Sequence, residues 1–166
     1  ICLKLTPICL FFLLFYPYTK RFTFLCHYFL GVALAMAPAG GYIAVTGELP
    51  FGIILLSGGV CLWIGSFDVI YGSQDRQFDL DHKLHSLATQ FGVANAHKIA
   101  AFFHFISILC FIGAGIYFDL SFIYYIGVLI AILTLIYQHS LITPYDFSRL
   151  TQVYFMRNGI VSIVIF

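Results

Sequence analysis

The chain has 166 residues, of which 61% are hydrophobic, 19% are aromatic and only 9% are charged. So little polar surface cannot cover a water-soluble globule, and we expect an integral membrane protein. The formal net charge is +1 and the chain lacks a long run of Lys and Arg, which excludes a nucleic-acid-binding surface.

Apolar runs long enough to cross a bilayer as helices follow one another along the chain. A helical span needs about 20 residues, and the runs lack the alternating pattern of a barrel strand. Complete spans are predicted at residues 24–45, 52–71, 99–118 and 121–137. Shorter runs at 5–16 and from Gly159 onward predict two truncated spans. The predicted fold class is therefore all-α, a polytopic transmembrane helix bundle.

We expect a single transmembrane domain over residues 1–166 that is incomplete at the N-terminus and at the C-terminus. The chain begins with Ile and its last apolar run stops at Phe166 in mid-pattern. Both ends therefore predict a fragment of a longer membrane protein, and we expect the fragment alone to be inactive.

The connections between the spans differ in length and polarity. Pro17 is predicted to end the first helix, because proline breaks the helical hydrogen-bond pattern. Residues 46–50 and Asp119 predict two tight turns, whereas residues 72–98 and 138–158 predict two long polar connections.

Lys and Arg collect in the connections that stay cytoplasmic, so their positions predict the orientation of the bundle. They occur in alternate connections: Lys20 and Arg21, then Arg76, Lys83 and Lys98, then Arg149 and Arg157. The turns at Glu48 and Asp119 contain none, and Lys4 is the exception. We therefore expect the three long connections to face the cytoplasm.

Four of the seven acidic residues lie within residues 68–81, between long apolar runs; they are Asp68, Asp75, Asp79 and Asp81. On a continuing α-helix, the first three would fall within about 40° of one another, while Asp81 would point to the other side. Carboxylates kept at a membrane edge are costly unless a cation or a charged ligand offsets them. The cluster therefore predicts a binding site.

Mg²⁺ is the cation that this pattern favours, because it prefers oxygen ligands and often binds through one or two carboxylates plus substrate phosphates. Asp75 and Asp79 are four residues apart, as a pair on one helix face would be. The alternative is a solvated helix end with Arg76 and Lys83 as local ion-pair partners. Four cations are predicted on the same cytoplasmic side of the membrane as the acids: Lys20, Arg21, Arg76 and Lys83. Their presence favours a diphosphate ligand, whose developing charge needs both a metal and positive side chains.

Several motifs together resemble one family. Residues 68–79, followed by L-H-S at 84–86 and F-G at 91–92, are similar to the second aspartate-rich motif of the UbiA-type intramembrane prenyltransferases. Residues 16–23, Y-P-Y-T-K-R-F-T, resemble that family's Y-P-x-x-K-R-x-T segment, and residues 40–47 resemble its G-x-I-A-V-T-G turn. The strings at 137–139 and 157–159 extend the similarity across nearly the whole chain.

The resemblance implies an enzyme that transfers a polyprenyl group from polyprenyl diphosphate to a small aromatic acceptor. It is nearest to the 4-hydroxybenzoate polyprenyltransferases of ubiquinone biosynthesis, and a relative from menaquinone biosynthesis stays open. It also implies Mg²⁺ as cofactor, a lipid bilayer as surroundings and an active site facing the cytoplasm, as in a bacterial inner membrane. The acceptor's identity, the isoprenoid length and the oligomeric state stay open.

The resemblance assigns roles to individual residues. Asp75 and Asp79 would hold Mg²⁺ and, with Lys20 and Arg21, form the catalytic group. The substrate-binding residues would be Asp68, Tyr71, Arg76 and His85. The apolar walls would hold the isoprenoid tail.

Two departures from the family pattern stand out. The first acidic motif of the family, N-D-x-x-D, is absent from these residues, and Lys83 stands where many members have a small residue.

Two functions of other classes stay open beside the enzyme. One is a small membrane transporter or ion-binding subunit whose aspartates bind a coupling ion, which would place the site near the bilayer midplane. The other is a structural or assembly role in which polar residues only hold helices together.

Overall fold

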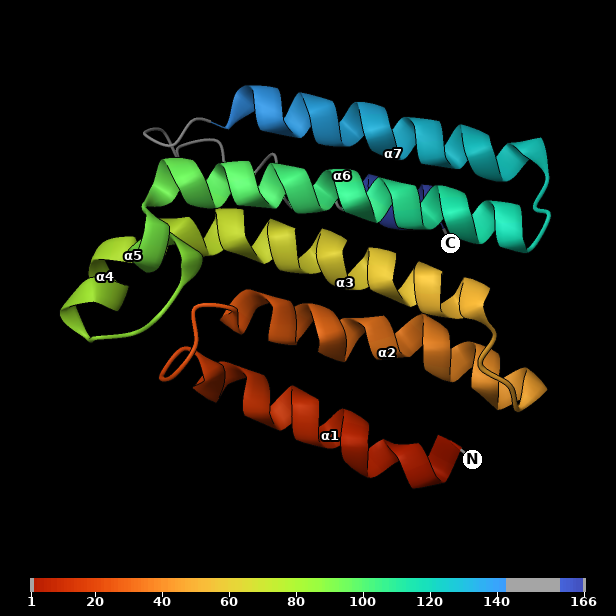
Figure 1. Cartoon of the computed structure of the whole chain (residues 1–166), viewed down its shortest axis with the longest axis horizontal. Coiled ribbons are helices and arrows are strands. Elements are labelled where there is room, and N and C mark those ends of the chain that lie inside the picture. The colour runs from red at the N-terminus through yellow and green to blue at the C-terminus, as the bar shows by residue number, and fades with distance from the viewer. Residues whose placement is uncertain (1, 143–158, 166) are drawn as a thin grey trace.

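The computed structural model describes residues 2–142 and 159–165, and every regular element in them is helical. The expected all-α class is confirmed. The long helices are α1 (Cys2–Thr19), α2 (Cys26–Thr46), α3 (Phe51–Gly72), α6 (Val93–Tyr117) and α7 (Phe122–Leu141). They lie side by side in chain order, each antiparallel to the one before it (Figure 1).

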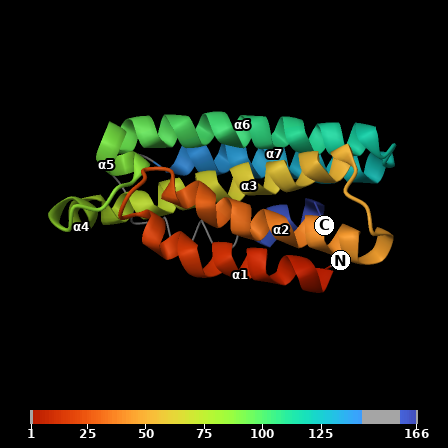
Figure 2. The same ribbon diagram turned by 60° about the horizontal axis from the view of Figure 1, so that its bottom comes forward.

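Three short elements lie between α3 and α6: η1 (Ser73–Asp75), α4 (Arg76–Asp81) and α5 (Leu87–Phe91). Figure 2 shows α4 and α5 together at one end of the bundle, the end that also carries the α1–α2 connection. Residues that are far apart in the sequence therefore meet there, and we call this the polar end.

Four helices are long and apolar enough to cross a membrane among the described residues: α2, α3 with its extension to Asp81, α6 and α7. These are the four predicted spans. The start of α6 lies at Val93 rather than at residue 99, because the small side chains Ala96 and Ala100 are buried against the polar-end core. The predicted loop 138–158 begins later than expected, because α7 continues to Leu141; the rest of that loop lies outside the described residues.

The prediction that Pro17 ends the first helix was wrong. Pro17 lies inside α1, which continues to Thr19. Proline removes one helical hydrogen bond, but so close to the helix end few bonds depend on it. The hydroxyl of Thr19 donates to the Tyr16 carbonyl oxygen and closes the last turn.

Both predicted tight turns are confirmed at the end opposite the polar end. Gly47 caps α2 with a left-handed backbone (φ 77°), which glycine adopts without steric cost, and its N–H donates to the Ile43 carbonyl oxygen over 2.9 Å. Asp119, between α6 and α7, also has a positive φ of 49°. Short-chained acidic residues tolerate this conformation better than most.

The core consists of apolar and small side chains at the helix interfaces. The main cluster joins α2, α3, α6, α7 and residues 159–165, with Trp63, Phe111 and Leu135 among its large members. A second cluster under α5 contains Val69, Ile70 and Leu87 and supports the polar end. Gly31 allows α2 to approach α3 closely, because a Cβ there would collide with the backbone carbonyl of Cys61.

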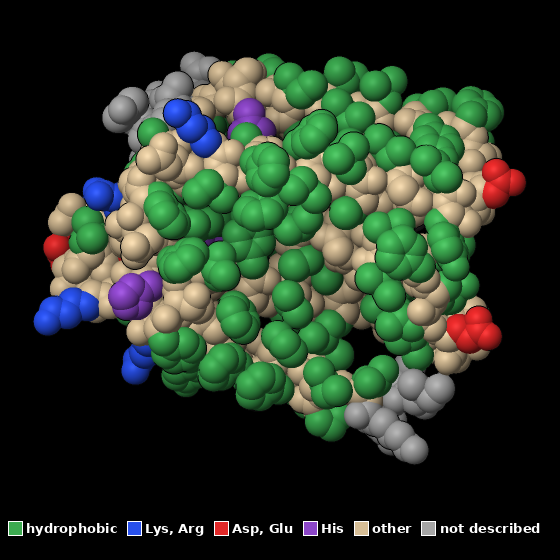
Figure 3. All heavy atoms as spheres, in the orientation of Figure 1, with side chains coloured by type: hydrophobic (Ala, Val, Ile, Leu, Met, Phe, Trp, Pro, Cys, Tyr) green, Lys and Arg blue, Asp and Glu red, His purple; other side chains and the backbone are tan. Residues whose placement is uncertain are grey.

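Charge divides the bundle into two ends. In Figure 3 the Lys and Arg side chains gather at the polar end, while apolar side chains cover the flank between the ends. Glu48 and Asp119 lie in the turns at the opposite end. The described connections that carry cations therefore share one end, as the sequence predicts.

Candidate active site

The polar end brings the end of α1 against the segment that follows α3. The backbone N–H of His85 donates to the carbonyl oxygen of Lys20 over 2.6 Å. Ser86 begins α5 with a capping box: its N–H donates to the Thr89 hydroxyl, and the Thr89 N–H donates to the Ser86 hydroxyl. These backbone links hold Lys20 beside α4.

Lys20 and Asp79 form the ion pair of this site. The Lys20 ammonium lies 3.1 Å from each carboxylate oxygen of Asp79. The Asp79 side chain is 1% exposed and that of Lys20 is 27% exposed. A buried carboxylate requires such a partner, since an unpaired charge away from water is costly. The predicted catalytic residues Lys20 and Asp79 are thus brought together.

Asp75 has different surroundings from Asp79. It ends η1 and is exposed to solvent, whereas Asp79 is buried. The expected single stripe of three carboxylates assumed an unbroken α-helix, and that premise was wrong. The hydroxyl of Ser73 donates to the Val69 carbonyl oxygen over 2.7 Å, and the chain tightens into the 3-10 segment just there.

Asp68, predicted to bind substrate, lies within α3 and pairs with His27 of α2. The distance from His27 Nδ1 to Asp68 Oδ2 is 2.8 Å. Both residues line a pocket of about 210 Å³ at the polar end. Its lining residues are Tyr16, Pro17, Lys20, Cys26, His27 and Asp68. The pocket therefore joins the Y-P-x-x-K-R segment to the start of the aspartate-rich one.

The alternative interpretation made Arg76 and Lys83 the ion-pair partners of the aspartates. In the described residues the pairs are instead Lys20–Asp79 and His27–Asp68. Arg76 Nε donates to the Ala88 carbonyl oxygen over 2.9 Å, which fixes α4 against α5. Lys83 is exposed in the turn after α4, with φ of 54°. Arg76 therefore positions the aspartate segment rather than neutralising it.

Three other predicted site residues, Arg21, Tyr71 and His85, are not among the residues that line this pocket. Arg21 is exposed, with its guanidinium carbon 5.9 Å from the centre of the Tyr18 ring. Tyr71 packs against the polar-end core. His85 lines a separate pocket with Leu84 and Thr89, and its backbone N–H is the group that donates to the Lys20 carbonyl oxygen.

The carboxylates suit a magnesium ion in kind, because their oxygen atoms are hard ligands. Within the described residues, no three His, Cys, Asp or Glu side chains are grouped closely enough to hold a metal ion. Mg²⁺ does not require such a group, since substrate phosphates and water commonly supply most of its ligands. Asp75 and Asp79 are carboxylates of the kind that Mg²⁺ binds, but both oxygens of the buried Asp79 lie 3.1 Å from the Lys20 ammonium, whereas Asp75 is exposed.

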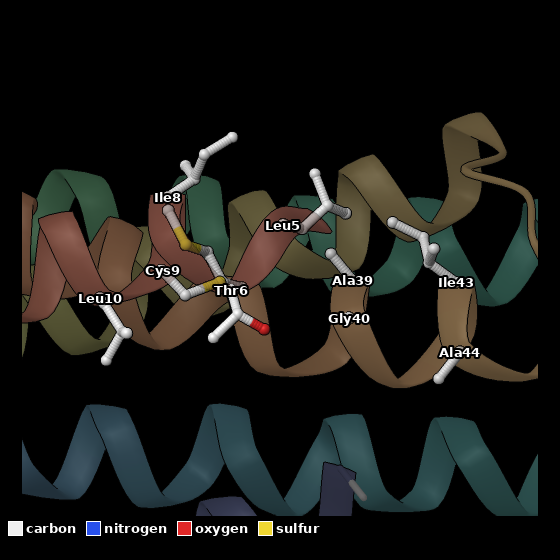
Figure 4. Close-up of a pocket in the computed structure, with 10 residues that line it drawn as sticks. Leu5, Thr6, Ile8, Cys9, Leu10, Ala39, Gly40, Ile43 and Ala44 are labelled. Atoms are coloured by element: carbon white, nitrogen blue, oxygen red, sulfur yellow. The ribbon is translucent and has the colours of Figure 1, made fainter. Parts of the chain in front are cut away.

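An apolar groove of about 460 Å³ runs between α1 and α2. Figure 4 shows Leu5, Ile8 and Cys9 from α1 on one side of it, with Ala39 and Gly40 from α2 on the other. At 1.5 Å per residue, Leu10 lies about 15 Å along the helix from Lys20. The groove therefore offers apolar walls at a distance from the polar pocket.

Sequence reasoning missed two histidine contacts. His27 is the second residue of α2, and Asp68 lies near the end of α3. Consecutive spans run in opposite directions, so the sequence already places these two residues at the same end of the bundle. His104 of α6 lies 2.9 Å from His139 of α7, measured from Nδ1 to Nε2, and its Nε2 is 3.1 Å from the Trp63 carbonyl oxygen. These contacts join three helices inside the bundle.

The family model for "UbiA prenyltransferase family" matches residues 1–160. The chain belongs to the UbiA prenyltransferase family. A solved structure described as the apo form of a UbiA homolog from Aeropyrum pernix K1 matches with a TM-score of 0.83 at 27% identity. The match covers 98% of this chain and 61% of that one. The family assignment rests on sequence and on fold together.

Curated relatives named 4-hydroxybenzoate octaprenyltransferase are also similar to this UbiA family member. The relative from Nitrosospira multiformis is 30% identical over 99% of this chain and 56% of its own length. The relative from Alcanivorax borkumensis is 37% identical over 76% of this chain and 43% of its own length. The chain spans about half the length of the curated relatives it matches.

Proposed function

We propose that the full-length protein transfers a polyprenyl group from polyprenyl diphosphate to a small aromatic acceptor of the 4-hydroxybenzoate kind. Membership of the UbiA family and the similarity to relatives named for this reaction support the proposal. The observation that carries it is the meeting of Lys20, Asp79 and Asp68 at one end of a membrane bundle. The product would enter ubiquinone or menaquinone biosynthesis.

The proposed reaction begins with loss of the diphosphate. Its allylic carbon–oxygen bond breaks, the electron pair leaves with the diphosphate, and an allylic cation remains. Lys20 and Arg21 would contact phosphate oxygens and stabilise the growing negative charge. Asp75 and Asp79 would hold Mg²⁺, which neutralises diphosphate charge when bound. The electron-rich ring of the acceptor then attacks the cation.

The apolar groove between α1 and α2 is the proposed location of the isoprenoid tail. Its lining is apolar apart from the Thr6 hydroxyl, and it begins within reach of a chain anchored near Lys20. Burying such a tail is favourable at roughly 25 cal/mol per Å² of apolar surface.

The transporter alternative is less well supported. A coupling-ion site belongs near the bilayer midplane, whereas Asp75 and Asp79 lie beyond the end of α3, in η1 and α4. We propose that this end faces the cytoplasm, in a bacterial inner membrane, because connections that carry Lys and Arg are retained there.

Substitution of the two aspartates tests the proposed function. In the full-length protein, Asp75→Asn and Asp79→Asn should each lower prenyl transfer to 4-hydroxybenzoate by about 10²-fold or more, since both remove charge from the diphosphate site. Chelation of Mg²⁺ should abolish transfer in the unsubstituted protein. Asp81→Asn is the control, because Asp81 is exposed and accepts a hydrogen bond from the side chain of Gln77. Normal transfer by both variants would reject the proposed role of the pair.

A further inference from the structure

His27 and Asp68 form an ion pair on the wall of the polar pocket. His27 Nδ1 lies 2.8 Å from Asp68 Oδ2, a distance typical of a charge-assisted hydrogen bond from an imidazolium to a carboxylate. The side chain of His27 is 4% exposed, so little water reaches its charge. The two charges compensate each other, as a charge held away from water requires.

The ring of His27 also packs against the backbone of α3 at Gly72. A Cβ added at position 72 would lie 2.6 Å from His27 Cε1 and 3.3 Å from Nε2. One edge of the ring therefore meets Asp68, and the other edge meets α3 one turn further along. His27 is fixed between these two contacts, so its effect on a ligand in the pocket is to hold Asp68 in place.

Asp68 keeps its second carboxylate oxygen for a ligand. The hydrogen bond found for Asp68 within the described residues uses Oδ2, and its side chain is 28% exposed where it lines the pocket. An ionised carboxylate accepts hydrogen bonds and cannot donate them. A ligand group that meets Oδ1 must therefore be a hydrogen-bond donor.

The pocket has the size of one aromatic ring and adjoins the proposed diphosphate site. Its volume is about 210 Å³, and a protein cavity of roughly 150 Å³ binds benzene. Lys20 lines this pocket, and its ammonium also contacts Asp79. A ring bound beside Asp68 would therefore lie next to a cation of the proposed diphosphate site.

We propose that this pocket binds the aromatic acceptor by its hydroxyl group, which donates a hydrogen bond to Asp68 Oδ1, and that His27 is the positioning residue for Asp68. This inference rests on the proposed function and deepens it, because it names the acceptor group that is recognised and the residue that recognises it. The carboxylate of a hydroxybenzoate cannot take the same place, since Asp68 would repel it. The carboxylate end of the acceptor therefore points away from Asp68.

The contact also determines which ring carbon reacts. A hydrogen bond to a carboxylate raises the electron density on the phenol oxygen, and the ring shares this density with its ortho and para carbons. The para carbon of 4-hydroxybenzoate carries the carboxylate, so an ortho carbon attacks the allylic carbon. Ring electrons form the new carbon–carbon bond, and the electron pair of the broken carbon–oxygen bond leaves with the diphosphate. The hydrogen on the alkylated carbon leaves as a proton to water, which restores aromaticity.

The test measures how strongly the full-length protein distinguishes a hydroxyl group from an ether on the acceptor. With the unsubstituted protein, kcat/KM for 4-hydroxybenzoate should exceed that for 4-methoxybenzoate by about 10²-fold or more, because the ether leaves Oδ1 unpaired. Asp68→Asn should lower this ratio at least tenfold. Its amide oxygen can accept from His27, and its NH₂ group then faces the pocket as a donor.

His27→Gln tests the positioning role separately. It should lower the ratio several-fold and raise KM for 4-hydroxybenzoate, while KM for the polyprenyl diphosphate is unchanged. Tyr28→Phe is the matched control, since it removes another α2–α3 contact, the 3.2 Å hydrogen bond to Ser66, outside the pocket. The ratio should stay the same in this control.

The outcomes separate this inference from the proposed function. Transfer by Asp68→Asn with an unchanged ratio would overturn the inference and leave the proposed function standing. Absence of transfer by the unsubstituted protein would overturn both. If Asp68→Asn does not fold or gives no transfer, equilibrium binding to the unsubstituted protein decides. Benzoate, which lacks the hydroxyl group, should bind at least tenfold more weakly than 4-hydroxybenzoate, and equal binding would overturn the inference.

Discussion

At the scale of single residues, the Lys20–Asp79 ion pair belongs to the candidate active site and also stabilises the fold. Both oxygens of a carboxylate that is 1% exposed depend on one ammonium from a segment 59 positions away. The neighbouring cation, Arg21, is exposed, and its guanidinium lies over the face of the Tyr18 ring. Two adjacent cations thus have different structural roles.

Lys20→Met should therefore destabilise the protein much more than Arg21→Met. The first change leaves Asp79 buried without its partner, at a cost of about 1–3 kcal/mol; the second removes an exposed contact worth roughly 0.5–1 kcal/mol. Thermal unfolding in detergent measures both. Adding Asp79→Asn to Lys20→Met should restore part of the loss, because the unpaired charge is gone. Equal effects of the two single substitutions would contradict the ion-pair description.

At the scale of elements, small residues decide where helices touch and where space stays open. Gly31 and Gly72 are positions where an added Cβ would meet a neighbouring helix. Gly40 and Gly41 have open space at the Cβ position, and only Gly40 lines the apolar groove. This difference makes the adjacent pair a test of the groove.

Gly40→Leu should shorten the isoprenoid chain that the protein accepts. The added side chain fills apolar space along α2, so transfer from a long polyprenyl diphosphate should fall several-fold while transfer from geranyl diphosphate is retained. Gly41→Leu has the same effect on intrinsic helix propensity but lies outside the groove. Product analysis with donors of increasing length measures the change. A uniform loss across all donors would place the tail elsewhere.

At the scale of the whole molecule, the two ends of the bundle differ in charge, and the proposed orientation follows from that difference. Glu48→Cys and Gln90→Cys place a thiol in an exposed position at opposite ends. In intact cells, an impermeant thiol reagent should label Glu48→Cys and should label Gln90→Cys only after permeabilisation. The unsubstituted protein gives the background from the native cysteines. The reverse pattern would invert the proposed orientation.

Features that depend on residues within one segment can be predicted from this sequence, whereas contacts between different helices cannot. Long apolar runs fix the four spans, because each run needs only its own residues to satisfy the backbone inside a membrane. The break at Ser73 was not predictable from spacing, since it depends on a local hydroxyl bond. The pairs Lys20–Asp79 and His27–Asp68 join different helices, so only the assembled bundle shows which cation neutralises which acid.

The hydrogen bonds around His104 have a consequence for motion within the bundle. A carbonyl oxygen only accepts, so His104 Nε2 must donate to Trp63, and Nδ1 must then accept from His139 Nε2 when the ring is neutral. This sequence of donors and acceptors permits one alignment of α3, α6 and α7. Sliding α7 by one turn, about 5.4 Å, would leave a nitrogen lone pair facing hydrocarbon. We therefore expect α3, α6 and α7 to move as one rigid body. Any opening of the bundle that admits a lipid substrate would then come from movement of α1 and α2.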